Sequence, residues 1–154
     1  MKKIFLAIVV LVLLSVTSSS CSKSDSSAVS PANNELFIQY KYNGVVYKHT
    51  VETLNSLKKN ILGYSGADNT YKRISLNIPL VPVAGTFSVV DQPSNVNSYE
   101  ALFESGTDYF YGTSGNITIS VSNSTIIEGT FQFSGDNGSG NVVVITEGSF
   151  RANK

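Results

Sequence analysis

The chain is poor in the residues that build metal, redox and covalent sites. It contains one cysteine (Cys21), one histidine (His49) and no tryptophan among 154 residues. A single cysteine excludes a disulfide within the chain. One cysteine and one histidine also cannot supply the several Cys or His ligands of a structural zinc site. The sequence therefore predicts a protein without a cofactor and without a metal held by these residues.

Charge is scarce as well. Only 14% of the residues are charged, and 11 basic residues balance 11 acidic ones, which gives a formal net charge of zero. The chain therefore has no basic footprint of the kind that nucleic-acid binding requires. It also has no polybasic segment that would add electrostatic attraction to a membrane. We expect no nucleic-acid partner.

The long hydrophobic run lies at the N-terminus. Lys2 and Lys3 precede eleven apolar residues, 4–14. A helix needs roughly 20 apolar residues to span a bilayer, so this run is too short for a permanent span. A basic start, an apolar centre and small residues after it are typical of a secretory signal peptide, which we predict over residues 1–20.

Ser18, Ser19 and Ser20 lead directly to Cys21. This segment resembles a bacterial lipoprotein signal, although Ser18 stands where the usual box has leucine. The resemblance implies cleavage between Ser20 and Cys21, and fatty acyl groups such as palmitate on the Cys21 thiol. The alternative is ordinary secretion, with cleavage at a nearby small residue and Cys21 left as a spare thiol.

Residues 22–34 are almost entirely small or polar, with no apolar period. Such a segment has little to bury and predicts a flexible tether, so residues 21–34 would form a lipidated linker. Thirteen extended residues reach at most ~45 Å. We expect anchoring at the bacterial outer membrane, on its periplasmic or surface face, with residues 35–154 as a single domain.

The remaining chain is rich in β-branched and aromatic residues, with Gly, Asn and Ser between them, which is typical of short strands and turns. Asn43-Gly44 lies between strand-like residues 36–42 and 45–50, and predicts a type I′ hairpin. Residues 52–60 fit either a short helix or an irregular connection. Further strands are predicted over residues 61–65, 71–77, 85–90, 99–104, 109–112, 116–122, 127–134 and 141–151. About nine or ten short antiparallel strands predict an all-β meander, folded as a sandwich or a flattened barrel.

A Gly-x-Phe pattern occurs three times, at residues 85–87, 129–131 and 148–150. Residues two apart in a strand share a face, so each glycine is expected to make room for a neighbouring ring or to let the strand coil. Gly148 also predicts a bend or bulge in the last strand. The pattern indicates packing rather than function.

The C-terminal strands carry a family resemblance. Residues 115–119 (GNITI), 127–133 (IEGTFQF) and 144–151 (VITEGSFR) are similar to the DUF6252-type lipoproteins of Bacteroidetes. The Asn43-Gly44 hairpin, residues 85–87 and Tyr99 add to the resemblance, which covers most of residues 36–151. It implies an envelope location and a β fold. Because that family has no established function, the resemblance implies no active residue.

Few residues suggest catalysis. His49 has no nucleophile motif beside it and is expected to be packed or at a rim. Four glutamates on predicted strands could in principle pair as glycosidase carboxylates, although alternation places at least two of them toward solvent. These four are Glu100, Glu104, Glu128 and Glu147. Residues 136–147 resemble a calcium loop only superficially, because glycines occupy two ligand positions, and a hairpin turn is favoured.

Tyrosines are the most promising functional side chains, because a phenol ring offers a flat apolar face and a polar tip. Of the eight tyrosines, Tyr109, Tyr111 and Tyr99 are the candidates for a ligand-binding surface or pocket. The other five are Tyr40, Tyr42, Tyr47, Tyr64 and Tyr71.

These observations predict a lipid-anchored envelope protein that displays a non-catalytic binding or interaction module. Its partner would be a glycan, a small apolar ligand or another envelope protein, in addition to the membrane that holds the Cys21 lipid. A structural component that scaffolds an envelope assembly is the alternative, and a hydrolase is the third hypothesis. An open cavity of ~300 Å³ or more, lined by Tyr and Phe, would favour ligand binding. A solid core would favour an outer-surface or structural role.

Overall fold

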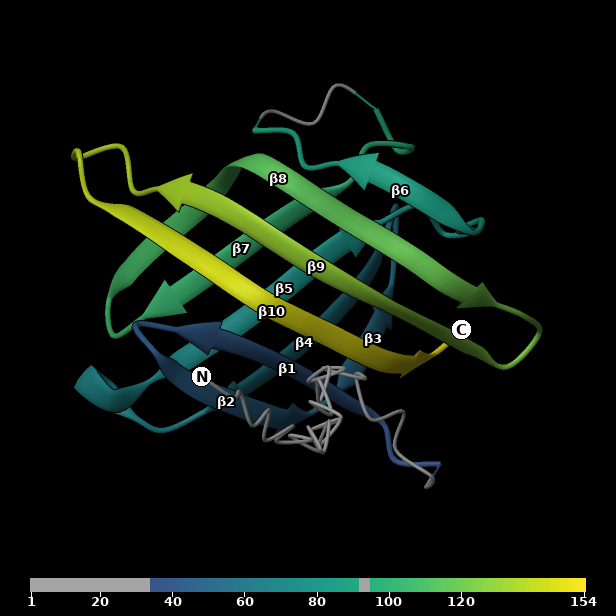
Figure 1. Cartoon of the computed structure of the whole chain (residues 1–154), viewed down its shortest axis with the longest axis horizontal. Coiled ribbons are helices and arrows are strands. Elements are labelled where there is room, and N and C mark those ends of the chain that lie inside the picture. Colours follow the sequence, from purple (N-terminus) through teal and green to yellow (C-terminus); the bar gives the residue numbers. More distant parts are fainter. Residues whose placement is uncertain (1–33, 92–94) are drawn as a thin grey trace, which may run out of the picture. The chain divides into compact units, whose positions relative to one another are not determined.

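A computed structural model describes residues 34–91 and 95–154, which form ten β-strands and one short 3₁₀ helix (Figure 1). The predicted signal peptide, Cys21 and all of the tether except Asn34 lie outside the described residues. The strands are β1 (Phe37–Tyr42), β2 (Val45–Thr50), β3 (Glu52–Asn55), β4 (Lys59–Ser65), β5 (Lys72–Ile78), β6 (Gly85–Ser88), β7 (Glu100–Ser105), β8 (Asp108–Ser122), β9 (Ile126–Asp136) and β10 (Val142–Asn153), and the helix is η1 (Asp68–Thr70). Among these residues no helix combines the length and apolar character needed to cross a membrane.

All ten strands belong to one sheet, in the order β2-β1-β10-β9-β8-β7-β5-β4-β3, with β6 paired to β8. Neighbouring strands are antiparallel. The two ends of this order, β2 and β3, are consecutive in the chain and are separated by Val51 alone. The sheet therefore curls into a nearly closed barrel, with β8, β9 and β10 on one side and β4, β5 and β7 behind them (Figure 1). The all-β prediction is confirmed, and the barrel is found rather than the sandwich.

The first hairpin forms as predicted. Asn43 (φ 49°) and Gly44 (φ 78°) both have positive φ, as a type I′ turn requires. The turn pairs β1 with β2 in register from Tyr42 opposite Val45 to Phe37 opposite Thr50. This register places Ile38 and Tyr40 inside the barrel, where both are fully buried.

Both interpretations of residues 52–60, a short helix and an irregular connection, are wrong. β3 runs from Glu52 to Asn55 and pairs with β4 across a tight turn, in which the Ser56 N–H donates to the Lys58 carbonyl at 3.0 Å. Leu54 and Leu57, whose spacing of three would suit one face of a helix, are exposed. A helix this short gains little without burial. A strand at this point instead pairs with β4 and continues the sheet to its closing edge.

The strands on one side of the barrel are longer than predicted. Residues 109–112 and 116–122 belong to one continuous strand, β8, and β9 extends to Asp136 into the predicted turn. The β8 register shifts between Gly112 and Ser114 and again between Ile119 and Val121. Such shifts let a long strand coil around the barrel without ending.

The Gly-x-Phe segments of β9 and β10 pack reciprocally. Gly148 lies opposite Phe131, and Gly129 lies opposite Phe150. A Cβ atom on Gly148 would be 2.4 Å from the Phe131 carbonyl oxygen, and one on Gly129 would be 2.9 Å from the Phe150 ring. The prediction that these glycines make room for rings is confirmed. The predicted bulge is also present, because the register shifts between Ile145 and Gly148.

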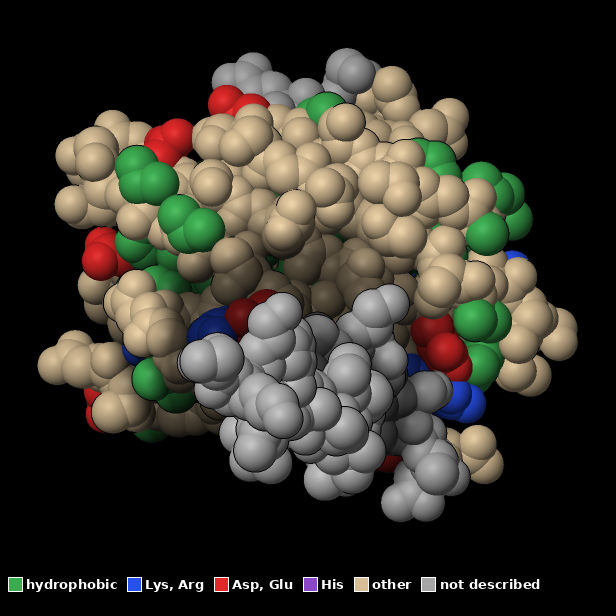
Figure 2. Space-filling view, in the orientation of Figure 1, with side chains coloured by type: hydrophobic (Ala, Val, Ile, Leu, Met, Phe, Trp, Pro, Cys, Tyr) green, Lys and Arg blue, Asp and Glu red, His purple; other side chains and the backbone are tan. Residues whose placement is uncertain are grey.

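The hydrophobic core fills the inside of the barrel and takes side chains from nearly every strand. Its largest fully buried apolar side chains are Tyr40, Phe103, Phe150, Ile38, Ile61, Ile74, Leu76, Ile78, Ile117, Ile119 and Ile127. The outer face of β8, β9 and β10 is mostly uncharged polar side chains and backbone, with charged groups scattered over it (Figure 2). The low charge of the sequence is thus visible on this surface.

Candidate functional site

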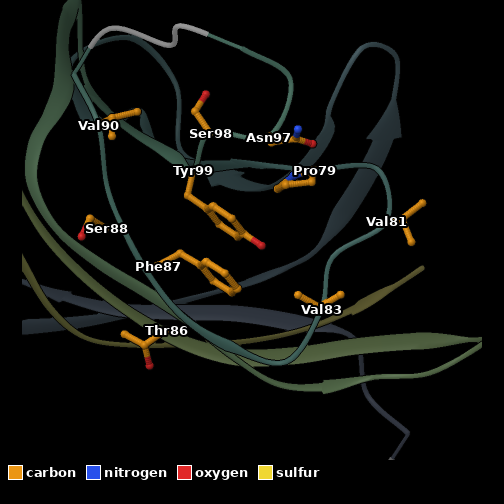
Figure 3. Close-up of a pocket in the computed structure, with 10 residues that line it drawn as sticks. All are labelled: Pro79, Val81, Val83, Thr86, Phe87, Ser88, Val90, Asn97, Ser98 and Tyr99. Atoms are coloured by element: carbon orange, nitrogen blue, oxygen red, sulfur yellow. The ribbon is translucent and has the colours of Figure 1, made fainter.

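An open pocket lies in the wall of the barrel beside β6, with a volume of about 510 Å³ (Figure 3). It is bordered by β6, by the segment that follows β5 and by the segment that precedes β7. Its lining residues are Pro79, Val81, Val83, Thr86, Phe87, Ser88, Val90, Asn97, Ser98 and Tyr99. Most of these side chains are apolar, and a few polar groups stand among them.

The pocket exists because the chain leaves the sheet twice at this place. Pro79 and Pro82 follow β5 and cannot donate to a ladder, so residues 79–84 cross from β5 to β6 outside the sheet. The Ser122 hydroxyl donates to the Pro82 carbonyl at 2.7 Å and ties this crossing to the end of β8. After β6 the chain leaves the sheet again, and Val89 and Tyr99 meet in an isolated bridge where it returns.

Two stacked rings form the floor of the pocket. Phe87 and Tyr99 are parallel, with ring centroids 4.1 Å apart and an interplanar angle of 1°. Tyr99 is only 6% exposed, and this burial raises the pKa of its phenol. The Tyr99 hydroxyl makes no hydrogen bond to another described residue and points toward the side of the pocket formed by Val81 and Val83 (Figure 3). It therefore lacks a protein partner among the described residues, in a pocket whose lining also includes Thr86, Ser88, Asn97 and Ser98.

A lysine from another hairpin holds the wall that carries Tyr99. Lys58, in the β3–β4 turn, donates through Nζ to the Ser98 carbonyl at 3.0 Å and to the Ser98 hydroxyl at 2.5 Å. The same ammonium group contacts the Glu100 carboxylate in a partly buried ion pair. Because Ser98 lines the pocket, Lys58 fixes one side of the pocket to the closing edge of the barrel.

The three tyrosines predicted as candidates do not come together. Tyr99 lines the pocket, whereas Tyr109 and Tyr111 lie on the outer wall of β8, where they are 52% and 57% exposed. Tyr109 instead belongs to a row that crosses four strands. In this row Tyr64 on β4 is opposite Arg73 on β5, Arg73 is opposite Glu104 on β7, and Glu104 is opposite Tyr109.

All four strand glutamates bond to different basic side chains. Arg73 donates to Glu104 at 2.8 Å, and Lys41 donates to Glu147 at 2.8 Å. Arg151 pairs with Glu128, and Lys58 pairs with Glu100. The described structure thus uses each of these carboxylates in its own ion pair.

The contacts of His49 and of the acidic loop after β9 indicate a structural role for both. Of the two predicted settings for His49, packed or at a rim, the structure shows the packed one, beside Tyr40 and Tyr47. In the loop after β9, the Asp136 carboxylate accepts the Gly138 N–H at 2.9 Å, and the Asn137 side chain accepts two further backbone N–H groups. This is the predicted hairpin turn.

Within the two described ranges no three His, Cys, Asp or Glu side chains gather as a metal site would require.

Sequence reasoning found Tyr99 but missed Phe87, Val81 and Val83 as its neighbours in the pocket. The available signal was the pair of prolines, Pro79 and Pro82, which marks a departure from the sheet in front of the Gly85-Thr86-Phe87 segment. Arg73 and Glu104 were also missed as a pair. Their contact depends on how β5 and β7 are aligned, which alternation along either strand does not reveal.

The fold and the pocket define a single-sheet, nearly closed β-barrel domain with an open apolar recess in its wall. The family model described as "Domain of unknown function (DUF6252)" matches residues 34–152. The chain belongs to this family. Comparison with the curated proteins and with the solved structures gave no match.

Proposed function

We propose that this protein is a lipid-anchored lipoprotein of a bacterial envelope, of the Bacteroidetes type, whose β-barrel is a non-catalytic binding module for a small apolar ligand. The open pocket at Phe87 and Tyr99 carries this proposal. Its volume of about 510 Å³ falls within the range of about 300–1,000 Å³ that is usual for small-molecule sites. The predicted signal peptide and Cys21 support the envelope location.

The chemistry of the pocket favours a flat, mainly apolar molecule with one polar group. The valines and Pro79 supply apolar walls, and the stacked rings of Phe87 and Tyr99 offer aromatic surface. The Tyr99 hydroxyl lacks a described protein partner, so a ligand hydroxyl or carbonyl would satisfy it. A well-placed polar group that bonds to a ligand fixes the orientation of the ligand and contributes specificity.

The test is a titration of the mature chain, which begins at Cys21, with 2-naphthol, a flat apolar probe that carries one hydroxyl. The chain has no tryptophan, so naphthol fluorescence can be excited beyond the tyrosine band without interference. Val83→Arg places a long charged side chain at the pocket, and we expect it to reduce naphthol affinity at least tenfold. Tyr99→Phe removes only the hydroxyl, and we expect it to reduce affinity several-fold.

Val144→Arg is the matched control, because Val144 is an exposed valine on β10 outside the pocket. This variant should bind naphthol as the unmodified chain does. An absence of naphthol binding, or an equal response of the two arginine variants, would refute the pocket as the binding site.

A further inference from the structure

We infer that one end of the barrel docks on the membrane surface, so that the domain rests on the bilayer instead of turning freely on its tether. The docking surface consists of exposed apolar side chains on two loops: Leu57 in the β3–β4 turn, and Leu80, Val81 and Val83 in the crossing from β5 to β6. This inference rests on the proposed lipid anchor. It adds to that anchor the face that the domain turns toward the lipid.

The predicted tether joins the domain at the same end of the barrel. β1 begins at Phe37, which lies opposite Arg151 near the end of β10 and opposite Thr50, the last residue of β2. β8 also ends there, and its last residue, Ser122, bonds to the Pro82 carbonyl between the apolar residues of the crossing. The segment before β1 and the docking surface thus share one end of the barrel, which lies at the right in Figure 1. We call it the tether end.

The two apolar loops lie beside each other. Lys59 at the start of β4 is opposite Ile78 at the end of β5, so the β3–β4 turn and the crossing leave the sheet as neighbours. Leu57 is 78% exposed and Val81 is 74% exposed. Figure 2 shows apolar side chains along the right edge of the molecule, where β6 begins. Exposed apolar patches mark interaction sites, and apolar side chains on neighbouring loops can enter the boundary between headgroups and acyl chains without a complementary cavity.

The distribution of charge favours an anionic lipid surface at the tether end. The glutamates near this end are neutralised in ion pairs, Glu35 with Lys48, Glu100 with Lys58 and Glu128 with Arg151. The turns and strand ends of the opposite end carry three aspartates outside the ion pairs of the described residues: Asp68, Asp108 and Asp136. Lys72 lies at that end too and offsets only one of them. Anionic headgroups would therefore repel the opposite end and accept the tether end.

The docking surface adjoins the pocket. Val81 and Val83 line the pocket and are also exposed, so an apolar ligand dissolved in the bilayer would enter beside Phe87 and Tyr99 without a long path through water. The tether would hold the domain within ~45 Å of the membrane, which gives the docking surface a high effective concentration of lipid. Weak docking is then enough, and it would not hold a chain that lacks the anchor.

The experiment places a nitrobenzoxadiazole label at either end of the barrel, in the lipidated mature chain on vesicles of phosphatidylethanolamine and phosphatidylglycerol. Acylation uses the thiol of Cys21, and the chain has no other cysteine, so Leu57→Cys supplies the thiol for labelling. Val142→Cys is the matched control, because Val142 is 68% exposed at the start of β10, at the opposite end. We expect nitroxide-bearing lipids to quench the label at position 57 at least about threefold more than the label at position 142.

Equal quenching of the two labels would overturn the inference. A blue shift of the label at position 57 without lipid quenching would assign the surface to a second copy of the chain and would overturn it as well. Flotation of the vesicles separates these results from a failure of the anchor, because a chain that does not float with the vesicles refutes lipidation and docking together.

A second pair of variants tests the apolar loops themselves. In the chain labelled at position 57, Val81→Asp puts a charge at the lipid interface, and we expect quenching to fall to about the level of the label at position 142. Val144→Asp is its control, because Val144 is an exposed valine on the wall of β10, and it should leave quenching unchanged. Unchanged quenching in Val81→Asp, or an equal fall in both variants, would overturn the assignment to these loops.

Discussion

His49 Nε2 lies 3.2 Å from the Tyr40 hydroxyl oxygen inside the barrel, and these two groups are hydrogen-bonded. The Tyr47 ring stacks on Tyr40, with centroids 5.4 Å apart. Burial lowers the pKa of His49 and raises the pKa of Tyr40, to which Tyr47 also contributes. Both groups are therefore held in their neutral forms at physiological pH.

This arrangement predicts an acid-sensitive fold. The folded-state pKa of His49 lies below its usual value of 6.5, so the unfolded chain binds a proton more readily. The contribution of neutral His49 to the free energy of unfolding is complete above the unfolded pKa and is lost as pH falls toward the folded pKa. The loss is at most about 1.4 kcal/mol per pH unit for one proton. Urea unfolding at several pH values between 7 and 5 would measure it.

His49→Gln provides the control for the pH prediction, because its amide stays neutral and can still bond to Tyr40. We expect the variant to be less stable at neutral pH but flatter in its pH dependence. A variant that loses stability as steeply as the unmodified chain would show that another group titrates.

The second prediction concerns the close approach of β9 and β10. A Cβ atom at Gly148 would be 2.4 Å from the Phe131 carbonyl oxygen and 2.6 Å from its ring. The ring can rotate, but the backbone oxygen belongs to the ladder and cannot move away cheaply. Gly148→Ala should therefore lower the free energy of unfolding by about 2 kcal/mol or more, as measured by chemical denaturation.

Gly138→Ala is the comparison for this variant. Gly138 lies in the β9–β10 turn at φ 71°, and a Cβ atom there would meet nothing within 4 Å. Its cost is only that of the left-handed backbone conformation, about 1 kcal/mol. If Gly148→Ala lowered the free energy of unfolding by less than Gly138→Ala does, the close packing of β9 on β10 would be refuted.

The third prediction concerns the lysine that fixes the pocket wall. Lys58→Ala removes the bonds to Ser98 and the ion pair with Glu100, which are partly buried. We expect a loss of about 1–3 kcal/mol in stability, because the partly buried Glu100 carboxylate loses its ion-pair partner and keeps only the bond from the Ser98 hydroxyl. Amide hydrogen exchange should also become faster at residues 97–99.

Lys48→Ala serves as the control for Lys58→Ala. Lys48 pairs with Glu35 at 2.8 Å, but both side chains are nearly half exposed. Exposed pairs contribute only about 0–1 kcal/mol, so this variant should be close to neutral. Faster exchange at residues 97–99 in both variants, or in neither, would contradict the proposed role of Lys58.

The fourth prediction concerns the anchor. Cys21→Ser removes the thiol that would carry the lipid. Stable membrane attachment needs at least two acyl chains or equivalent signals, and no polybasic patch is present to replace them. We expect the variant to fold normally, with the same melting temperature, but to move from the membrane to the soluble fraction. A variant that still sediments with membranes and is released only by detergent would refute lipidation.

Local patterns predicted the parts of the fold that depend on neighbours in sequence. Asn43 and Gly44 specify their turn by backbone preference alone, and the alternation of Ile117 and Ile119 with polar residues specifies a strand. β3 was missed because residues 52–55 become a strand by pairing with β4 and closing the sheet, which is a property of the whole barrel. The pocket was found only in part, since Phe87 and Tyr99 stack across a chain excursion. Likewise, the Arg73–Glu104 pair depends on inter-strand register.

The pairing of β1 with β10 has a consequence for how the protein is made. The strand that leaves the ribosome first can complete its hydrogen bonds only when the last strand has arrived. Contacts of such long sequence separation form slowly, and the incomplete sheet exposes unpaired strand edges meanwhile. Any chaperone that protects the folding chain must therefore shield the free edge of β1 until β10 is available.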